Sequence, residues 1–363
     1  HSSHRRQRQM CIRDRNTANG AYALMGNESG NMNVAAGYEA MLFNESGNSN
    51  VAIGSYALWY NTDHSNLVAI GDSALFNNGR GILTNPVFAT GNVAIGSKCL
   101  VSNISGYHNT ATGFEASFHN ADGTKNTALG YRSAYSNISG TKNTAIGMYA
   151  LYFNTSGSYR TGLGYSSNSL DTTLHNSTGV GYDADPLAAN TIHIGNSQVI
   201  SIKGQVGFST FSDGRFKTNI KNDEVKGLEF ITKLAPVTYR YDVAAYQGWK
   251  SRHFNESDTA DWPQKNDIEN IRFSGFIAQD VEAAAKESGY DFSGVDLPKN
   301  EKDIYGLRYA EFVVPLVKAV QELNEKLESQ NAELQSQVLE LRAELEQLNC
   351  LLYTSDAADD ANC

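Results

Sequence analysis

One motif recurs along the first half of the chain, a short apolar stretch followed by glycine, as in VAIG, TALG and TAIG. Each of these glycines lies 17 residues after the previous one, except for one interval of 25 residues. They are Gly20, Gly37, Gly54, Gly71, Gly96, Gly113, Gly130, Gly147, Gly164 and Gly181. The eight additional residues surround GRGILTNPV and leave the later register unchanged, as a loop insertion would. Ten copies at one period predict a stacked, solenoid-like array.

Each repeat predicts one strand and two turns. VAI or TAL suits a short strand, the glycine permits a turn that a side chain would block, and an Asn/Ser/Gly-rich stretch follows. A repeat carries only about four apolar side chains, so neighbouring coils and neighbouring chains must complete the burial. The repeat resembles the left-handed β-roll heads of trimeric adhesins and the shafts of phage and bacterial fibre proteins. This resemblance implies a mainly β shaft, a trimeric β-roll or solenoid, over residues 16–189.

Two functions stay open for the repeats, a rigid spacer or a surface that binds a host receptor or a glycan. Aromatic rings stack on sugars, although rings beside the motif would also pack between coils; these rings are Tyr38, Tyr56, Phe114, Tyr131 and Tyr149. The Asn-x-Ser/Thr sequences are interpreted as repeat turns rather than glycosylation acceptors; they begin at Asn27, Asn44, Asn103, Asn137 and Asn154. Four histidines share no metal-ligand spacing and are expected at the surface: His64, His108, His119 and His175. We predict no metal site and no cofactor.

The two ends, residues 1–15 and 350–363, are expected to be foreign to the protein. RRQRQMCIRDR and CLLYTSDAADD back-translate to reverse complements, as an adaptor read at both ends would. Without them Cys99 is the one cysteine left of four, which excludes a disulfide framework and favours a small apolar filler. The flanks hold five Arg and four Asp, so the net charge changes from −10 to −11, which argues against nucleic acid as a partner. No apolar run is long enough for a membrane span.

The periodicity ends near Asn190, and residues 190–211 alternate as one or two closing strands would. Lys, Asp and Glu then become more frequent and Gly less so. VKGLEFITKLAPVTYRY predicts a short helix, a proline break and a strand, and IRFSGFIAQDVEAAAKESG predicts a strand leading into a helix. IYGLRYAEFVVPLVKAVQEL predicts a strand and a turn, then the start of a long helix.

Four motifs of this segment occur in order, SDGRFKTNI, LAPVTYRY, FSGFIAQDVE and YGLRYAEFVVPLVKAVQEL. The segment resembles the intramolecular chaperone domain of endosialidase-type tail spikes, the S74 peptidase family. The resemblance implies a small α+β domain over residues 212–312 that trimerises, helps the preceding fibre to fold and then cleaves itself at its N-terminal boundary. It maps the family's serine–lysine dyad onto Ser212 and Lys217, and the cut between Phe211 and Ser212.

The residues agree with that chemistry only if the chain turns between Ser212 and Lys217. Helical neighbours lie three or four residues apart rather than five, whereas Asp213 and Gly214 are typical of a turn. A serine hydroxyl attacks a carbonyl when a base takes its proton, and a lysine serves where burial or a nearby cation favours its neutral form. Backbone N–H groups or Arg215 would stabilise the oxyanion. Spacing alone would make this a chance pair, so the prediction depends on the flanking motifs.

Residues 313–349 have heptad spacing with Glu and Lys on the outer faces, which predicts a parallel coiled coil. The d-like row is Val313, Val320, Leu327, Leu334, Leu341 and Leu348, and the a-like row is Val317, Asn324, Asn331, Val338 and Leu345. A single amphipathic helix packed on a domain is the weaker alternative at this length. The two asparagines would fix register and oligomer number at a cost in stability. We expect a homotrimer, because the repeats and the resemblance both imply three chains, although the heptads alone also fit a dimer.

The leading hypothesis is a phage tail fibre or spike, part of the virion, whose shaft is assembled by a C-terminal domain that cleaves its own chain once. The alternative is a bacterial surface adhesin that keeps this domain as a permanent trimer cap. A carbohydrate-degrading enzyme finds little support, because the repeats contain no recurrent carboxylate pair of the kind that glycoside hydrolysis needs.

Overall fold

The structure, a computed structural model, describes residues 15–81, 88–254 and 265–359, the last nine as helix backbone only. Residues 1–14 and 360–363 of the flanks predicted to be foreign therefore lie outside the described residues. The chain divides into two compact units, which are considered one at a time.

The first unit joins three parts of the sequence. It comprises the chain up to Lys203, Tyr241–Ile271 and Lys299–Asp303. The second unit comprises Gly204–Arg240, Arg272–Pro298 and the chain from Ile304 onward.

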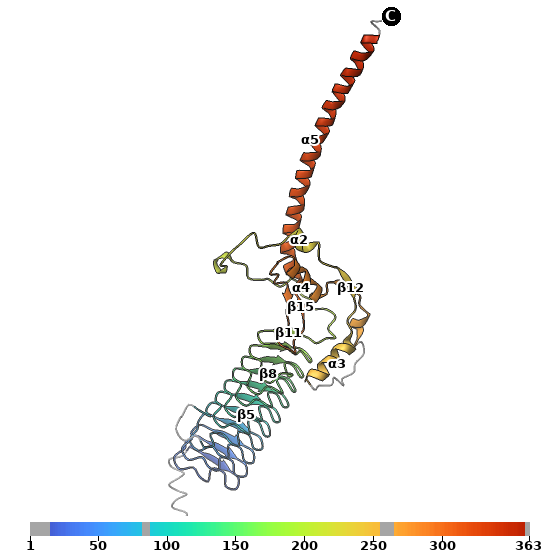
Figure 1. The fold of residues 1–363 in the computed structure, drawn as a ribbon. Coiled ribbons are helices and arrows are strands. Elements are labelled where there is room, and N and C mark those ends of the chain that lie inside the picture. The colour runs from blue at the N-terminus through green and yellow to red at the C-terminus, as the bar shows by residue number, and fades with distance from the viewer. Residues whose placement is uncertain (1–14, 82–87, 255–264, 360–363) are drawn as a thin grey trace, which may run out of the picture. The chain divides into compact units, whose positions relative to one another are not determined.

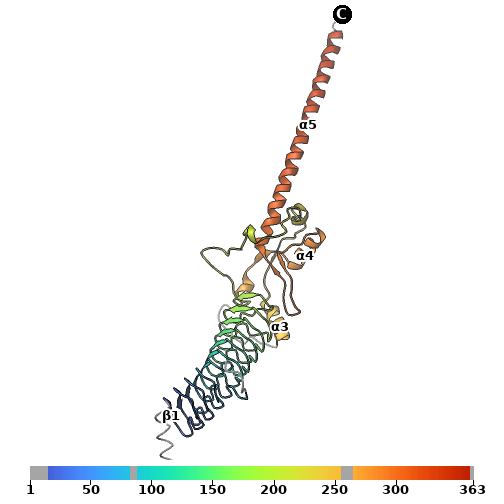
Figure 2. The same ribbon diagram turned by 90° about the vertical axis from the view of Figure 1, so that its left-hand side faces the viewer.

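The first unit is dominated by a solenoid whose coils each contribute one three-residue strand to an 11-stranded parallel sheet (Figures 1 and 2). Neighbouring strands pair in sequence order and in register, so that Ala52 lies between Ala35 and Ala69. The longer interval after Gly71 leaves the next pairing in register, with Val68 opposite Val93. The predicted β-solenoid with 17-residue spacing is confirmed. In order, the strands are β1 (Thr17–Asn19), β2 (Val34–Ala36), β3 (Val51–Ile53), β4 (Val68–Ile70), β5 (Val93–Ile95), β6 (Thr110–Thr112), β7 (Thr127–Leu129), β8 (Thr144–Ile146), β9 (Thr161–Leu163), β10 (Thr178–Val180) and β11 (Ile192–Ile194).

The recurring glycine is required by the close approach of neighbouring coils. Gly54 has φ +132°, and a Cβ added there would lie 2.5 Å from the carbonyl oxygen of Gly71. Residues other than glycine also adopt positive φ in every coil, and some of them are large, for example Tyr56 at 59° and Leu58 at 53°. This conformation is unfavourable for such residues, and it is held here by hydrogen bonds to both neighbouring coils. The Tyr56 N–H donates to Tyr38 O (2.9 Å), and the Leu58 N–H donates to Ala74 O (3.0 Å).

A row of buried asparagines runs through the solenoid, one from each of eight coils. In each coil after the first, the side-chain amide donates to the asparagine of the preceding coil and to a backbone carbonyl of its own coil. This carbonyl belongs to a glycine except for Asn61, which donates to His64 O, and Asn78, which donates to Ala89 O. Asn120, for example, donates to Asn103 Oδ1 (3.0 Å) and to Gly123 O (3.1 Å). Five of these residues begin the Asn-x-Ser/Thr sequences, and their burial confirms that those sequences are structural turns. The row is Asn27, Asn44, Asn61, Asn78, Asn103, Asn120, Asn137 and Asn154.

Arg160 ends this row. Its fully buried guanidinium donates to Asn154 Oδ1 (2.9 Å) and Asp171 O (2.6 Å) through Nη1. Through Nη2 it donates to the carbonyl oxygen and to Oδ1 of Asn168, at 2.9 and 2.6 Å. Burial lowers the pKa of Arg160 to about 10, so the group stays charged at neutral pH. One cation thus satisfies four oxygens where the asparagine pattern stops.

Replacing Arg160 with methionine should lower the free energy of unfolding by about 3 kcal/mol, because it leaves buried oxygens without donors. Arg132→Met is the matched control, since Arg132 is half-exposed and its ion pair with Glu115 should contribute at most about 1 kcal/mol. Thermal unfolding followed by circular dichroism measures both. Equal melting temperatures for the two variants would contradict the assigned role of Arg160.

Two smaller sequence predictions have different outcomes. Cys99 is fully buried, and burial raises the pKa of its thiol to about 12, which confirms it as an apolar filler. The prediction that His64 lies at the surface is wrong, because only 2% of it is exposed. Its imidazole fills the space beside Gly79, where an added Cβ would lie 2.0 Å from the ring. His64 stands in the last coil before the longer interval, where the repeat pattern changes. His108, His119 and His175 are exposed, as predicted.

The second unit is a small α+β body with a long helix. Its elements are α2 (Leu228–Ile231), β12 (Val237–Tyr239), β13 (Phe273–Gly275), α4 (Ala278–Glu287), β14 (Val295–Asp296), β15 (Gly306–Leu307) and α5 (Val313–Asp359). β12 pairs antiparallel with β13, and β14 pairs with β15. Phe230, Val281 and Phe292 form the centre of its core. The predicted helix and strand segments are confirmed, and α5 continues ten residues beyond position 349.

Residues 190–211, predicted to form one or two closing strands, contain one strand, β11, among the described residues. One element of the fold was not predicted. Helix α3 (Val243–Phe254) belongs to the first unit, although its sequence lies between β12 and β13 of the second. Its apolar and polar residues show little helical periodicity, so no amphipathic pattern marks this helix in the sequence.

Candidate functional site

The segment between the two predicted catalytic residues folds as a tight turn. Asp213 accepts a hydrogen bond from the Arg215 backbone N–H (2.9 Å), and a single 3-10 turn, η1 (Gly214–Phe216), follows. The turn closes when the Lys217 N–H donates to Gly214 O (3.2 Å). The predicted turn at Asp213–Gly214 is therefore present.

This turn brings the two side chains together. Lys217 Nζ donates to Ser212 Oγ at 2.7 Å. The contact has the geometry that a general base needs to take a proton from a hydroxyl. Ser212 and Lys217 are both exposed within one chain, so water reaches the pair freely.

Arg215, predicted as an oxyanion donor or supporting residue, points to Asp213. Its Nε lies 3.1 and 3.0 Å from the two carboxylate oxygens, and its Nη2 lies 2.6 Å from Oδ2. The hydrogen bonds from the Arg215 side chain lower the pKa of Asp213, and the hydrogen bond from the Arg215 backbone N–H lowers it further. In this structure Arg215 therefore stabilises the turn.

The predicted scissile bond lies in an exposed stretch of chain. Residues 201–220 are all exposed, and the Phe211 side chain is fully accessible to solvent. The peptide bond between Phe211 and Ser212 is therefore not covered by other parts of the chain.

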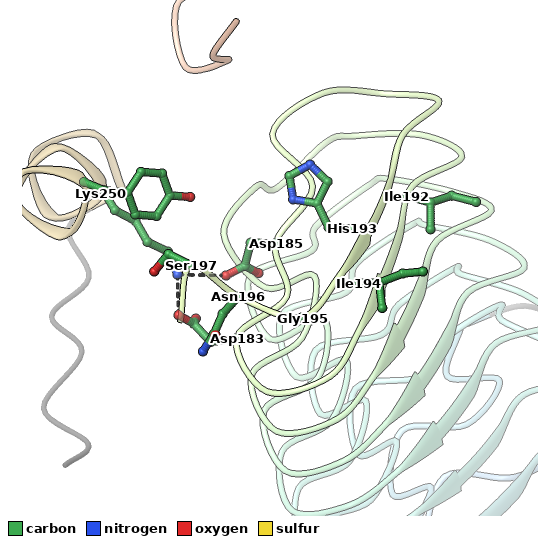
Figure 3. Close-up of a pocket in the computed structure, with 10 residues that line it drawn as sticks. Asp183, Asp185, Ile192, His193, Ile194, Gly195, Asn196, Ser197 and Lys250 are labelled. Carbon is green, nitrogen blue, oxygen red and sulfur yellow. Dashed lines mark hydrogen bonds and ion pairs between the residues drawn. The ribbon is translucent and has the colours of Figure 1, made fainter. Parts of the chain in front are cut away.

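A second group of polar side chains lies in the first unit, where α3 meets the end of the solenoid. Lys250 of α3 reaches two carboxylates of the last coils, with Nζ 2.6 Å from Asp183 Oδ2 and 3.1 Å from Asp185 Oδ2 (Figure 3). All three side chains are at least nine-tenths buried. They line a cavity of about 300 Å³ together with His193 and Tyr246. Sequence analysis missed this cluster, because Lys250 is 65 residues or more from its partners.

Burial shifts the pKa of one carboxyl group in this cluster. Burial raises the pKa of Asp183 to about 7, repulsion from Asp185 adds to the rise, and Lys250 partly offsets it. The neighbouring His193 has its pKa lowered by burial, against the attraction of Asp303. Within the described ranges, no group of three or more His, Cys, Asp or Glu side chains is placed to hold a metal ion.

The raised pKa of Asp183 predicts how pH affects the contact of α3 with the solenoid. A raised pKa means that the folded state favours the protonated carboxyl of Asp183. The stabilisation of the contact by this group is therefore complete below about pH 4 and is lost as the pH rises to about 7. The protection of α3 amides from hydrogen exchange, compared between the natural chain and Asp183→Asn at each pH, should show this loss. His193, whose pKa is lowered by burial, would shift the stability in the opposite direction with pH. Because both proteins contain His193, its effect cancels in the comparison. A constant difference from pH 4 to pH 8 would contradict the assignment.

The aromatic rings along the repeats contact one another from coil to coil. Tyr38 and Tyr56 lie 5.5 Å apart between ring centroids, and Phe114 stacks on Tyr131 at 5.6 Å. Packing between coils is thus established for these rings, which nonetheless remain partly exposed.

The chain thus joins a β-solenoid to a small α+β body that begins with an exposed Ser–Lys pair. Residues 212–290 match the family model Peptidase_S74, described as chaperone of endosialidase. The match spans 79 of the 363 residues and begins at Ser212. These residues therefore form a chaperone domain of the S74 peptidase family, as the sequence motifs predicted. No curated protein matches the chain. Among the described helices, none is both long and apolar enough to cross a membrane.

Proposed function

We propose that this chain is a tail fibre or spike of a virion, with the solenoid as its shaft and the C-terminal domain as a self-cleaving folding aid. The combination of a solenoid with an S74 chaperone domain supports a fibre-like protein. The observation that carries the cleavage proposal is the Lys217–Ser212 hydrogen bond at the first residue of the matched domain. A bacterial surface adhesin with a permanent trimer cap is the alternative, and it predicts a chain that stays uncut.

The proposed reaction begins when Ser212 Oγ attacks the carbonyl carbon of Phe211 while Lys217 Nζ takes the hydroxyl proton. The peptide C–N bond breaks, the nitrogen of Ser212 receives a proton from the lysine, and an ester joins Phe211 to Ser212 Oγ. Water then hydrolyses the ester. The products are a carboxylate at Phe211 and a free amine at Ser212.

This reaction needs more than the single exposed dyad. A lysine acts as a base where burial or a nearby cation favours its neutral form, and one chain leaves Ser212 and Lys217 open to water. We therefore propose that neighbouring chains enclose the dyad, so that cleavage follows assembly. Asp213 and Arg215 serve as positioning residues, because they hold the turn that keeps Lys217 on Ser212.

Ser212→Ala and Lys217→Ala should each lower the cleavage rate by about 10³-fold or more, as in other catalytic pairs. Lys221→Ala is the control, since Lys221 is an exposed lysine nearby that pairs with Glu224. A denaturing gel with intact-mass analysis should show fragments ending at Phe211 and beginning at Ser212 for the natural chain and the control alone. A cut at another bond, or cleavage in the Ser212→Ala variant, would refute the assignment.

The long helix supports a homotrimer. The apolar residues of both heptad rows on α5 are exposed in one chain, for instance Leu327 by 54% and Leu334 by 57%. Such a face is unfavourable in water unless other helices cover it. Three copies of α5 in a parallel coiled coil would cover it and would bring three dyads to one end of the assembly.

Leu327→Lys combined with Leu334→Lys should dissociate the trimer, because charges at core positions cannot be buried unpaired. Leu339→Lys is the matched control, since Leu339 is 65% exposed and lies outside both rows. Analytical ultracentrifugation gives the mass of each variant. A natural chain that sediments as a monomer or dimer would overturn the trimer proposal.

A further inference from the structure

We infer that the part of the chain beyond the cut stays bound to the end of the solenoid after cleavage, through α3 and the segment around Asn300. This inference rests on the proposed function for the position of the cut. The contact follows from the structure alone, because the first unit contains residues from both sides of Phe211–Ser212.

The central contact is the insertion of Lys250 between Asp183 and Asp185. Asp185 is held in place from the solenoid side, because its Oδ1 accepts a hydrogen bond from the Ser169 backbone N–H (2.7 Å). Its Oδ2 and that of Asp183 then face the lysine, so one lysine contacts both carboxyl groups (Figure 3). Since an unpaired charge is costly to bury, α3 fits here only when the last coils have folded and both carboxylates are in place.

Further contacts flank the cluster. Gln247 of α3 donates to Ser197 Oγ (3.3 Å), and Asn300 Nδ2 donates to Leu187 O (2.9 Å). Val243 and Ile268, from beyond the cut, are also buried within the first unit. The solenoid end is therefore contacted by two separate stretches of the C-terminal part, Tyr241–Ile271 and Lys299–Asp303.

The connection that cleavage removes contributes little to this association. Residues 204–211 are exposed throughout, and a Cβ added to Gly207 would meet no atom within 4 Å. Cutting the chain at Phe211 thus leaves every contact of α3 and Asn300 intact. In a trimer the same contact would occur three times, and linked contacts dissociate far more slowly than single ones.

The inference can be tested separately from self-cleavage. A recognition sequence for a specific protease is inserted after Gly207 in the full-length Ser212→Ala chain, which is then cut by that protease. A denaturing gel should show two fragments, whereas size-exclusion chromatography at micromolar concentration should show them eluting together. Elution of the C-terminal fragment on its own would overturn the inference. This result does not depend on whether the natural chain cleaves itself between Phe211 and Ser212.

Substitutions then locate the contact. Lys250→Met should speed the dissociation of the cut fragments by about 10-fold or more, and Lys326→Met, an exposed lysine on α5, should not change it. Because Lys250→Met could also disturb the last coils, Asn300→Ala provides a second variant that leaves no buried charge and should give a smaller increase. If the cut parent chain and the three variants all dissociate at the same rate, α3 and Asn300 do not hold the fragments together.

Discussion

The hydrogen bonds between residues one coil apart hold the solenoid together. One coil has too few apolar side chains for a core, and its backbone adopts conformations that Tyr and Leu avoid in isolation. Each coil is stable because the next one accepts and donates at matching positions, in the backbone and in the asparagine row. A coil at either end lacks one of these neighbours. Toward the C-terminal end of the solenoid the sequence departs from the repeat. Arg160 ends the asparagine row inside the solenoid, and α3 contacts the last coils from outside.

This constraint connects the shaft to the domain that follows it. The last coils present Asp183 and Asp185, and the chain returns after the exposed 204–211 stretch to cover them with Lys250. The candidate cleavage site and the covering helix are thus separate parts of one C-terminal segment. In the proposed function, the first would change the covalent chain, and the second would bind the folded end of the solenoid.

The repeat could be predicted from sequence because its glycines are fixed by contacts between backbones, which allow no other residue. The closeness of Ser212 and Lys217 could also be predicted once the flanking motifs had marked the segment, because the turn that joins the two residues is local and Asp213–Gly214 is typical of a turn. The buried position of His64 and the Lys250 cluster were missed for a different reason. Both depend on partners brought together only by the stacking of coils or by the return of the chain, and no periodicity marks them.

The loop between Gly71 and Gly96 shows that a coil can grow without disturbing its neighbours, because Val68 and Val93 still pair in register. The same independence applies to the number of coils. Each coil adds one strand spacing, about 4.8 Å, along the sheet, so gain or loss of one whole repeat would change the reach of the shaft by that step. Gain or loss of whole repeats would then change the length of the shaft while both of its ends stay unchanged.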